Sequence, residues 1–379
     1  MKVRAAVLHE PGQVTIETVE LDEPGPGEVR VRVAAAGVCR SDLHLVYCAL
    51  GEGRWPMVLG HEGAGVVEAV GEGVSGLRVG DAVGFSFVPS CGACAQCRAG
   101  RLNLCEPAAL AALRGTLLDG TSRLSLPDGT PLQHGLMTAC FAERVVVMAN
   151  GAVPLREGLP LWQAALLGCG VMTGFGAVRN VARVQRGESV VVIGLGGVGL
   201  QVLAAARLAG ADPLVAVDRD PAKLALALER GATHAVDTAE ERLVRTLRTI
   251  TAGGADHAFE VVGRADTLLL AWKALRPGAT ATVVGLAPMG VEVALPAIEF
   301  LQDKAIRGTY YGSGDPAADL PALAELVKGG ELDLTGVVSH VGPLDEALEA
   351  LERLRRGEGA RTVLIVDDEL AGSHFRPGG

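Results

Sequence analysis

The sequence has few aromatic residues, a modest share of charge and no excess of positive charge. Aromatic side chains make up 3% of the 379 residues and charged side chains 21%, and the formal net charge is −10. Because a nucleic acid or an anionic membrane needs a basic face, we expect neither as a partner. The 51 glycines and the 49% hydrophobic content favour an α/β enzyme packed from Ala, Val, Leu and Gly.

Long uninterrupted apolar runs and a secretory leader are also missing. The stretch VVVIGLGGVGLQVLAAA (190–206) is broken by glycines, so we interpret it as core and not as a membrane span. No basic run leads into an apolar stretch at the amino terminus, which predicts a cytoplasmic protein. Its eight cysteines should then be reduced, and they should serve metal binding or catalysis.

The chain is long enough for two or three domains, and its pattern changes near Leu159. Before that point, short alternating runs such as EVRVRVA (28–34) lie between Gly and Pro turns, which predicts a β-rich, partly barrel-like unit. After it, strands alternate with helices of about ten residues, which predicts a doubly wound parallel sheet. The tail from Gly312 shows two helices and one strand, RTVLIVD (361–367). The pattern leaves open which of the two domains the tail joins.

A glycine-rich turn in the second region indicates a dinucleotide site. An apolar strand runs into Gly194-x-Gly196-x-x-Gly199 and a helix, and the next strand, PLVAVD, ends at Asp218. The glycines permit the tight turn, the approach of a pyrophosphate and the close packing of the helix. A carboxylate at Asp218 favours NAD over NADP, although the adjacent Arg219 weakens that inference. The alternative is a turn that binds nothing.

Four cysteines form a compact motif. Cys91, Cys94, Cys97 and Cys105 have the spacing C-x2-C-x2-C-x7-C. Four thiolates around one zinc ion fill its coordination shell, so this site should be structural and not catalytic. An iron–sulfur cluster and a set of metal-free thiols are the alternatives.

The other cysteines are widely separated in the chain. Cys39, His61 and Cys169 have the residue types of a catalytic zinc site, which keeps one coordination position open. Spacing does not link three residues so far apart, and each taken singly is more typical of a buried side chain. Cys48 and Cys140 are expected to be small buried side chains.

Several stretches together resemble the zinc-dependent medium-chain alcohol dehydrogenases, over nearly the whole chain. They are GVCRSDLH (37–44), VLGHEGAGVVEAVGEGV (58–74), CGACAQCRAGRLNLC (91–105), LLGCGVMTGFGAV (166–178), VIGLGGVGL (192–200), FEVVGRADT (259–267) and RTVLIV (361–366). The stretch from Gly115 to Val147 is similar to the long-chain branch of the family, which includes the animal alcohol dehydrogenases and the thiol-dependent formaldehyde dehydrogenases.

The resemblance implies a division into domains and a set of zinc ligands. A GroES-like catalytic domain would cover 1–170 and 312–379, and an NAD-binding Rossmann domain would cover 171–311. The catalytic zinc would be bound by Cys39, His61 and Cys169, and a structural zinc by the four-cysteine motif.

The resemblance also implies roles for residues around the catalytic zinc. Asp42 would orient His61, and Glu62 would lie near the metal. Zinc would lower the pKa of the bound alcohol, and the hydride would pass to nicotinamide. The proton would leave through Ser41, a ribose hydroxyl of the cofactor and His44 at the surface. Cofactor contacts are implied for Arg40, Lys223 and Arg361, and a substrate pocket for Trp55, Phe87, Leu136 and Tyr310.

The implied activity is the reversible, NAD-dependent oxidation of a primary or aromatic alcohol to its aldehyde, by a homodimer or homotetramer. The alternative is a formaldehyde dehydrogenase acting on a glutathione or mycothiol adduct. That activity needs basic residues at the pocket mouth, where ALAALRG (109–115) offers only Arg114. Zinc-free NADP reductases and non-catalytic relatives share the fold, but they would lack some of the ligands or relay residues that this sequence has.

Overall fold

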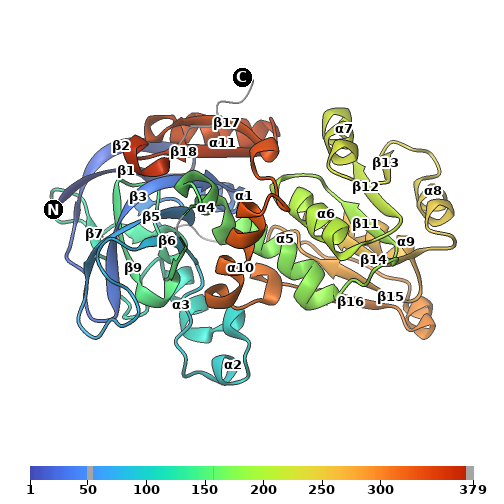
Figure 1. The fold of residues 1–379 in the computed structure, drawn as a ribbon, viewed down its shortest axis with the longest axis horizontal. Coiled ribbons are helices and arrows are strands. Elements are labelled where there is room, and N and C mark those ends of the chain that lie inside the picture. The colour runs from blue at the N-terminus through green and yellow to red at the C-terminus, as the bar shows by residue number, and fades with distance from the viewer. Residues whose placement is uncertain (49–53, 157, 373–379) are drawn as a thin grey trace. The chain divides into compact units, whose positions relative to one another are not determined.

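The computed structural model describes residues 1–48, 54–156 and 158–372, and the chain forms two compact units. The first unit comprises Met1–Cys169 with Gly314–Gly379, and the second comprises Gly170–Ser313. Figure 1 shows the blue and red ends of the chain together in the first unit, while the second unit is built from the yellow and orange middle part.

Two sheets form the framework of the first unit. The smaller sheet has the strand order β7-β2-β1-β4-β8, with the bounds β1 Lys2–Glu10, β2 Gln13–Leu21, β4 Met57–Val58, β7 Leu124–Ser125 and β8 Gln133–His134. The larger sheet has the order β10-β6-β5-β3-β18-β17, and β9 also pairs with β3. Its bounds are β3 Glu28–Val38, β5 Glu62–Val70, β6 Ala82–Phe85, β9 Arg144–Met148, β10 Ala152–Pro154, β17 Val338–Pro343 and β18 Arg361–Ile365.

Strand β3 positions the chemistry of the first unit. In its first half the valines are buried while Arg30 and Arg32 are partly exposed, as the period of two in the sequence predicts. Its second half, AAAGV, is buried throughout. There Gly37 pairs with Glu62 at the start of β5. The end of β3 therefore lies beside the beginning of β5.

Short helices complete the first unit. They are α1 Arg40–Val46, α2 Ala95–Arg98, α3 Glu106–Arg114, α4 Leu161–Leu166, α10 Pro316–Lys328, α11 Ala347–Arg356 and α12 Asp368–Ala371, with the 3-10 turns η1 Leu102–Leu104, η2 Gly135–Met137, η3 Ala149–Gly151, η8 Thr335–Val337 and η9 Leu344–Glu346. Local signals set several of these ends. Pro107 lies in the first turn of α3, and the helix stops at Gly115, whose φ of 66° favours glycine.

The tail contains two strands where the sequence pattern predicted one. β18 was expected from RTVLIVD, but β17 was missed because its residues, VSHVGP, include a serine, a histidine, a glycine and a proline. β18 pairs antiparallel with β3 and parallel with β17. This pairing joins the tail to the first unit, a point that the pattern had left open.

The second unit is a parallel sheet with the strand order β13-β12-β11-β14-β15-β16. The bounds are β11 Val190–Ile193, β12 Leu214–Asp218, β13 His234–Asp237, β14 Ala255–Glu260, β15 Leu275–Val283 and β16 Ala305–Gly308. The order reverses between β11 and β14, the place where such sheets bind ligands at their carboxyl ends. The predicted doubly wound α/β fold is confirmed.

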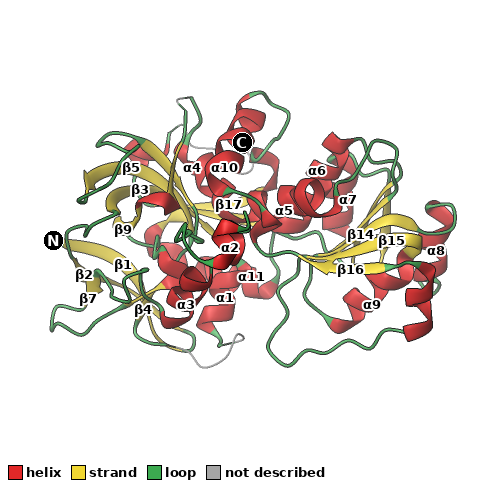
Figure 2. Cartoon of the chain, turned by 90° about the horizontal axis from the view of Figure 1, so that it is seen from below, coloured by secondary structure: helices red, strands yellow, loops and turns green. Residues whose placement is uncertain are grey.

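Helices cover the faces of this sheet. They are α5 Met172–Gly176, α6 Gly197–Ala209, α7 Pro221–Glu229, α8 Leu243–Ile250 and α9 Ala265–Ala274, with the shorter turns η5 Ala177–Ala182, η6 Ala297–Gln302 and η7 Tyr311–Ser313. The turn η4 Leu167–Val171 begins in the first unit, and the chain passes into the second unit at Gly170. Figure 2 shows α6 and α7 on one side of the sheet and α9 on the other. The core strand β11 is Val-Val-Val-Ile and fully buried, as expected for a parallel strand covered on both faces.

One helical stretch, Leu161–Ala182, is long and apolar enough to cross a membrane. However, 89% of its 18-residue window is buried inside the structure. Burial of this extent is typical of a core helix. The cytoplasmic location stays a prediction.

Candidate zinc and nucleotide sites

The first group of metal-ligating side chains forms where β3 ends and β5 begins. Cys39 is the N-cap of α1, directly after β3, and His61 directly precedes β5. Cys169 lies in the π-helical turn η4, which follows α4, and α4 packs against both strands. All three residues are buried, and their ligand atoms lie within 4.8 Å of one another. We call these three residues the Cys-His-Cys group.

Asp42 holds His61 in one orientation. Its Oδ1 lies 2.9 Å from Nδ1 of His61, and its Oδ2 accepts the backbone N–H of Cys39 at 3.1 Å. Nε2 of His61 is buried and has no hydrogen-bond partner among the described residues. A buried ring nitrogen without a partner is unfavourable unless it binds something. A histidine that gives its N–H to a carboxylate and presents its other nitrogen is typical of a metal ligand.

Contact between the two thiols favours the form that binds metal. Sγ of Cys39 lies 3.8 Å from Sγ of Cys169. This contact lowers the pKa of Cys39 well below its usual value, and the same contact raises the pKa of Cys169. The group therefore favours a thiolate at Cys39, and the thiolate is the form in which cysteine binds metal.

Glu62 and Arg361 form a buried ion pair beside this group. Nη2 of Arg361 donates to Oε2 of Glu62, and both side chains are almost fully buried. Burial raises the pKa of Glu62, while the guanidinium opposes that shift. Gly37 leaves room for the carboxylate, since a Cβ there would lie 2.7 Å from Oε2. The structure thus places the Arg361 guanidinium on Glu62, and its contact with a cofactor stays a prediction.

The second group consists of the four cysteines of the compact motif, on the segment that carries α2 and η1. Their sulfur atoms lie within 4.8 Å of one another, and Sγ of Cys91 is 4.0 Å from Sγ of Cys97. Backbone N–H groups point at the sulfurs: that of Cys94 donates to Cys91 at 3.3 Å, and that of Cys97 to Cys94 at 3.5 Å. Backbone hydrogen bonds of this kind lower the pKa of Cys94 to about 6. We call these residues the four-cysteine group.

Both groups fit zinc in donor type and in spacing. Two sulfurs on one tetrahedral zinc ion, at about 2.3 Å each, are about 3.8 Å apart. The observed separations of 3.8 and 4.0 Å agree with that value, and they are too long for a disulfide. Four cysteines close the coordination shell, whereas two cysteines and one histidine leave a position open.

The glycine-rich turn lies at the carboxyl end of β11 in the second unit. Gly194 has a φ of 95°, and a Cβ on Gly199 would lie 1.8 Å from the carbonyl oxygen of Gly194, so α6 packs directly on the turn. Gly196 is the N-cap of α6, and nothing lies within 4 Å of an added Cβ there. Open space in front of the free N–H groups of a helix start is suited to a phosphate.

Asp218 ends β12 and faces this turn. Its Oδ2 accepts the N–H of Leu195 at 2.7 Å, and its Oδ1 accepts the N–H groups of Arg219 at 2.8 Å and Asp220 at 3.1 Å. The structure therefore brings the predicted carboxylate to the predicted glycines. Lys223 lies in the first turn of α7, the helix that follows.

Two family patterns cover most of the chain. The alcohol dehydrogenase GroES-like domain matches residues 25–157, and the zinc-binding dehydrogenase pattern matches residues 197–329. The S-(hydroxymethyl)glutathione dehydrogenase of Paracoccus denitrificans is 34% identical over 96% of this chain and 100% of its own length. The alcohol dehydrogenase class-3 of Drosophila melanogaster is 36% identical over 95% of this chain and 97% of its own. The chain belongs to the zinc-dependent medium-chain alcohol dehydrogenase family.

Solved structures of related dehydrogenases agree with this assignment. The benzyl alcohol dehydrogenase of Acinetobacter calcoaceticus superposes with a TM-score of 0.91 at 30% identity, over 97% of this chain and 99% of its own. A zinc-binding dehydrogenase of Sinorhizobium meliloti 1021, bound to NADP, superposes with a TM-score of 0.79 at 26% identity, over 97% of this chain and 100% of its own. The predicted family, the oxidoreductase class and membership of a zinc-binding family are confirmed, and the NADP-bound neighbour agrees with the expected nicotinamide cofactor.

Helix α1 carries the residues that the family resemblance implied for proton transfer and for one cofactor contact. Arg40 is exposed, and Oγ of Ser41 lies 3.8 Å from Sγ of Cys39. His44, expected at the surface, is instead 9% exposed. Its burial and the neighbouring Arg40 lower its pKa. His44 is buried because it lies on the packed side of α1, where Leu43 and Val46 are also buried.

The predicted pocket residues differ widely in burial. Phe87 is buried, and its ring meets that of His61 edge-on, with the centroids 5.2 Å apart. Leu136 is partly buried in η2, and Trp55 is 36% exposed. Tyr310 belongs to the second unit and is 46% exposed. Phe87 therefore contacts the Cys-His-Cys group, and the pocket as a whole stays a prediction.

Glu260 lies in the stretch FEVVGRADT (259–267) but was not predicted as a site residue. Glu260 ends β14, and it is fully buried beside Ile193 of β11. Its Oε1 accepts the N–H groups of Val262 and Gly263 at 2.9 and 2.8 Å, and the hydroxyl of Thr267 at 2.7 Å. The carboxylate thus fixes the loop beside the glycine-rich turn. A glutamate at the carboxyl end of a strand, directly after the apolar Ala258 and Phe259, was the available signal.

The two remaining cysteines differ from each other. Cys140 is fully buried, as expected, and burial raises its pKa well above the usual value. Cys48 is only partly buried, and its φ of 56° places it in a turn after α1. The expectation of a buried Cys48 is therefore wrong, because the helix ends before this residue and exposes it.

Proposed function

We propose that this protein oxidises an alcohol to its aldehyde with NAD, at a zinc ion held by the Cys-His-Cys group. The observation that carries the proposal is His61: Asp42 fixes its Nδ1, while its Nε2 is buried and unpartnered between two thiols. We assign the four-cysteine group to a structural zinc, because four ligands leave no position for a substrate.

The bound groups supply the chemistry and the residues supply its environment. Zinc, when bound, provides a Lewis acid that favours deprotonation of an alcohol, and nicotinamide provides the hydride acceptor. The Ser41 hydroxyl, beside Cys39, is placed to receive the proton. We propose that His44 is the last member of this relay; its lowered pKa keeps the imidazole neutral and able to accept a proton. Phe87 covers His61 and keeps water from one side of the group.

Asp218 supports NAD as the cofactor. Its carboxylate lies against the glycine-rich turn and is held by three backbone N–H groups. Such a carboxylate accepts hydrogen bonds from ribose hydroxyls and repels a 2′-phosphate. Replacing Asp218 with asparagine should therefore narrow the preference for NAD over NADP.

An aromatic alcohol is the substrate class that we favour. Phe87 gives the wall beside His61 an aromatic surface, and a benzyl alcohol dehydrogenase is among the similar structures. The second candidate is a thiol adduct of formaldehyde. It is favoured by whole-length relatives named S-(hydroxymethyl)glutathione dehydrogenase. Arg114, exposed at the end of α3, offers a cation for the adduct's carboxylates.

We also propose a homo-oligomer that pairs through β16. This strand is at the edge of its sheet, and the neighbouring η6 exposes Ile298 at 70%, Phe300 at 44% and Leu301 at 81%. An open strand edge beside exposed apolar side chains is suited to a second copy of the chain. Analytical ultracentrifugation of Leu301→Glu should show a shift toward monomer.

One kinetic screen tests the activity. The purified protein, with its zinc content measured, is assayed with benzyl alcohol, ethanol and a secondary alcohol, using NAD and NADP, with and without formaldehyde plus glutathione. We expect two zinc ions per chain and the fastest turnover with benzyl alcohol and NAD. Turnover only in the presence of formaldehyde and glutathione would favour the thiol adduct over the aromatic alcohol as the substrate. One zinc per chain, or no turnover of any of these substrates, would overturn the assignment.

A further inference from the structure

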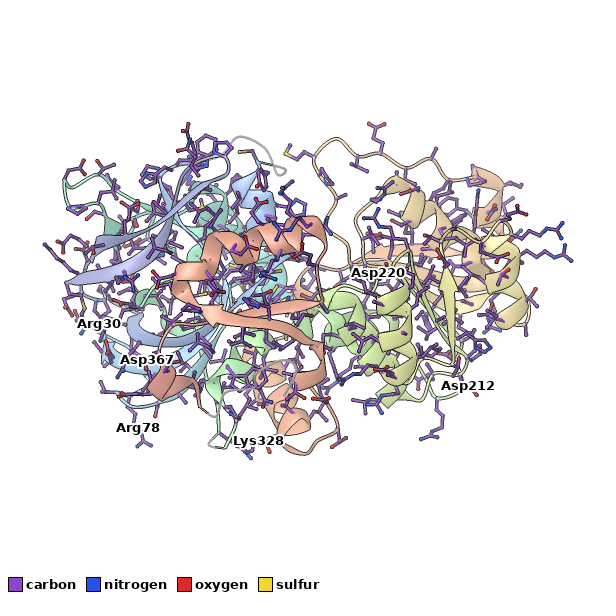
Figure 3. The ribbon with its side chains drawn as sticks, turned by 90° about the horizontal axis from the view of Figure 1, so that it is seen from above. Arg30, Arg78, Asp212, Asp220, Lys328 and Asp367 are labelled. Atoms are coloured by element: carbon purple, nitrogen blue, oxygen red, sulfur yellow. The ribbon has the colours of Figure 1, made fainter. Side chains whose placement is uncertain are left out.

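A cavity lies in the first unit, and none of its lining residues belongs to either group of zinc ligands. Its volume is about 510 Å³, and its lining includes Arg30 and Arg32 of β3, Arg144 of β9 and Glu68 of β5. Arg32 and Cys39 are seven residues apart along an extended strand, so about 23 Å separate the cavity from the Cys-His-Cys group. Figure 3 labels Arg30 and Asp367 on the same part of this unit.

The three arginines are neighbours on one face of the sheet. Arg32 and Arg144 are directly opposite each other in the antiparallel pair β3–β9, and Arg30 is two residues along the same strand. Like charges directly opposite in a sheet are destabilising. The chain as a whole has a net charge of −10, so three arginines lining one cavity are a local excess of positive side chains.

Four carboxylates lie close to the three arginines, and they differ in exposure. Glu68 accepts from Nε of Arg144 at 2.8 Å and lies 3.7 Å from Nε of Arg30, and Asp367 accepts from Nε of Arg32 at 2.6 Å. Two further carboxylates are close: Glu23 accepts from Nη1 of Arg30 at 2.7 and 2.6 Å, and Glu369 lies 3.6 Å from Nη2 of Arg32.

Exposure reduces the effect of that second pair of carboxylates. The side chain of Glu23 is 74% exposed and that of Glu369 is 87% exposed. Exposed carboxylates are screened by water and neutralise a cavity weakly. The three guanidinium groups therefore have two partly buried carboxylates beside them, that of Glu68 in the lining of the cavity and that of Asp367 next to Arg32.

One donor in this set lacks a partner. Nε of Arg30 is buried, and it has no hydrogen bond to any described residue. A buried N–H without an acceptor is costly, so an acceptor from outside the chain is favoured. Guanidinium groups are suited to phosphate oxygens, which they bind in pairs. Val66, Val79 and Leu370 also line the cavity and give it apolar walls beside the cations.

We propose that this cavity binds a phosphate group, either free or carried by a small organic molecule. The three arginines provide the donors, and the apolar walls provide room for an organic substituent. The site is independent of the proposed alcohol oxidation, since no residue in it belongs to the zinc or nucleotide sites.

Calorimetry on the zinc-loaded protein tests the proposal. Inorganic phosphate and phenyl phosphate are titrated with NAD at saturation, so that the nucleotide site is filled, and sodium chloride at equal ionic strength is the reference. We expect one phosphate site per chain with a Kd of about 1 mM. Tighter binding of phenyl phosphate would identify an organic ligand, and equal binding a free phosphate. No binding above the chloride reference would overturn the proposal.

Two substitutions of opposite sign make the test specific. Arg144→Gln should weaken phosphate binding at least tenfold, and Glu68→Gln should strengthen it several-fold, because it removes an enclosed negative charge. The matched control is Arg355→Gln, because Arg355 is exposed near the end of α11 and pairs with Glu352. This variant should bind phosphate as the unchanged protein does. Alcohol oxidation should stay within twofold in all three variants. If Glu68→Gln weakens binding, the arginines form only a structural ion-pair network and the proposal is wrong.

Discussion

The two groups of zinc ligands differ in how far apart their members lie in the sequence and in how deeply they are buried. The four-cysteine group comes from one stretch of 15 residues, and two of its members, Cys91 and Cys94, are partly exposed. The Cys-His-Cys group joins residues up to 130 positions apart, and all its members are buried. A local loop can close around a metal almost by itself. A buried open site needs the whole first unit to hold its ligands in place.

The largest expected effect is on catalysis. Cys169→Ala removes one ligand from the open site, and we expect kcat/KM to fall about a thousandfold or more, with one zinc ion left per chain. Metal analysis and steady-state kinetics measure both. Cys140→Ala, a buried cysteine outside both groups, is the control and should keep two zinc ions. If Cys169→Ala kept most of the activity, the distinction between the two groups would fail.

The second effect is on stability. Cys94→Ala opens the four-cysteine group, and because metal binding is linked to folding, the free energy of unfolding should fall by several kcal/mol. Activity should fall only as the protein unfolds. Chemical denaturation and zinc content are measured together, with Gln96→Ala on the same short helix as the control. Two retained zinc ions and unchanged stability would show that this group does not bind zinc.

Acid should destabilise the fold even where no metal is involved. His134 is fully buried, and its burial lowers its pKa to about 4, with Arg123 lowering it and Asp119 opposing. The pKa of His134 in the unfolded chain is near 6.5, so as the pH falls the unfolded chain takes up this proton before the folded protein does. Stability should therefore be intact above pH 6.5 and decline as the pH falls toward 4, by about 3 kcal/mol in total.

Replacing the histidine separates this loss from acid release of zinc. In His134→Gln the slope of unfolding free energy against pH should be smaller between pH 6.5 and 4. Exposed His234→Gln should leave the slope unchanged. An unchanged slope in His134→Gln would assign the whole acid loss to the zinc ligands and the remaining titrating groups.

The smallest effect concerns the orientation of the histidine ligand. Asp42→Asn keeps the shape but removes the charge that fixes Nδ1 of His61, so we expect a 10- to 100-fold loss of zinc affinity or activity. The rate of zinc transfer to a chelator measures it, with exposed Asp22→Asn as the control. Among the described residues the sulfurs of the four-cysteine group accept hydrogen bonds from backbone N–H groups, and Asp42 is not near them, so the zinc of that group should leave at an unchanged rate.

Local patterns predicted much of this protein. The period of two in EVRVRVA predicted β3, and the alternation of strands and helices predicted the parallel sheet. Four cysteines within 15 residues come together in any compact loop. The glycine-rich turn was readable because two of its constraints are local: Gly194 has a φ of 95°, and Gly199 packs against the carbonyl oxygen of Gly194.

Other features were beyond any local pattern. β17 was missed because its pairing with β18, and not its composition, makes it a strand. His44 was expected at the surface, but its exposure depends on what packs against α1. The arginine cavity emerges only from strand pairing, which places residues from separate strands side by side.

The sequence by itself determined the alternation of strands and helices in the second unit, where the glycine-rich turn lies and which four cysteines cluster. These follow from periodicity and spacing over a few residues. Only the tertiary structure decided that Cys39, His61 and Cys169 meet, with Asp42 behind the histidine. Their meeting depends on the register of β3 against β5 and on the packing of α4 over both strands. Such contacts are set by burial of the whole unit, which no short stretch of sequence contains.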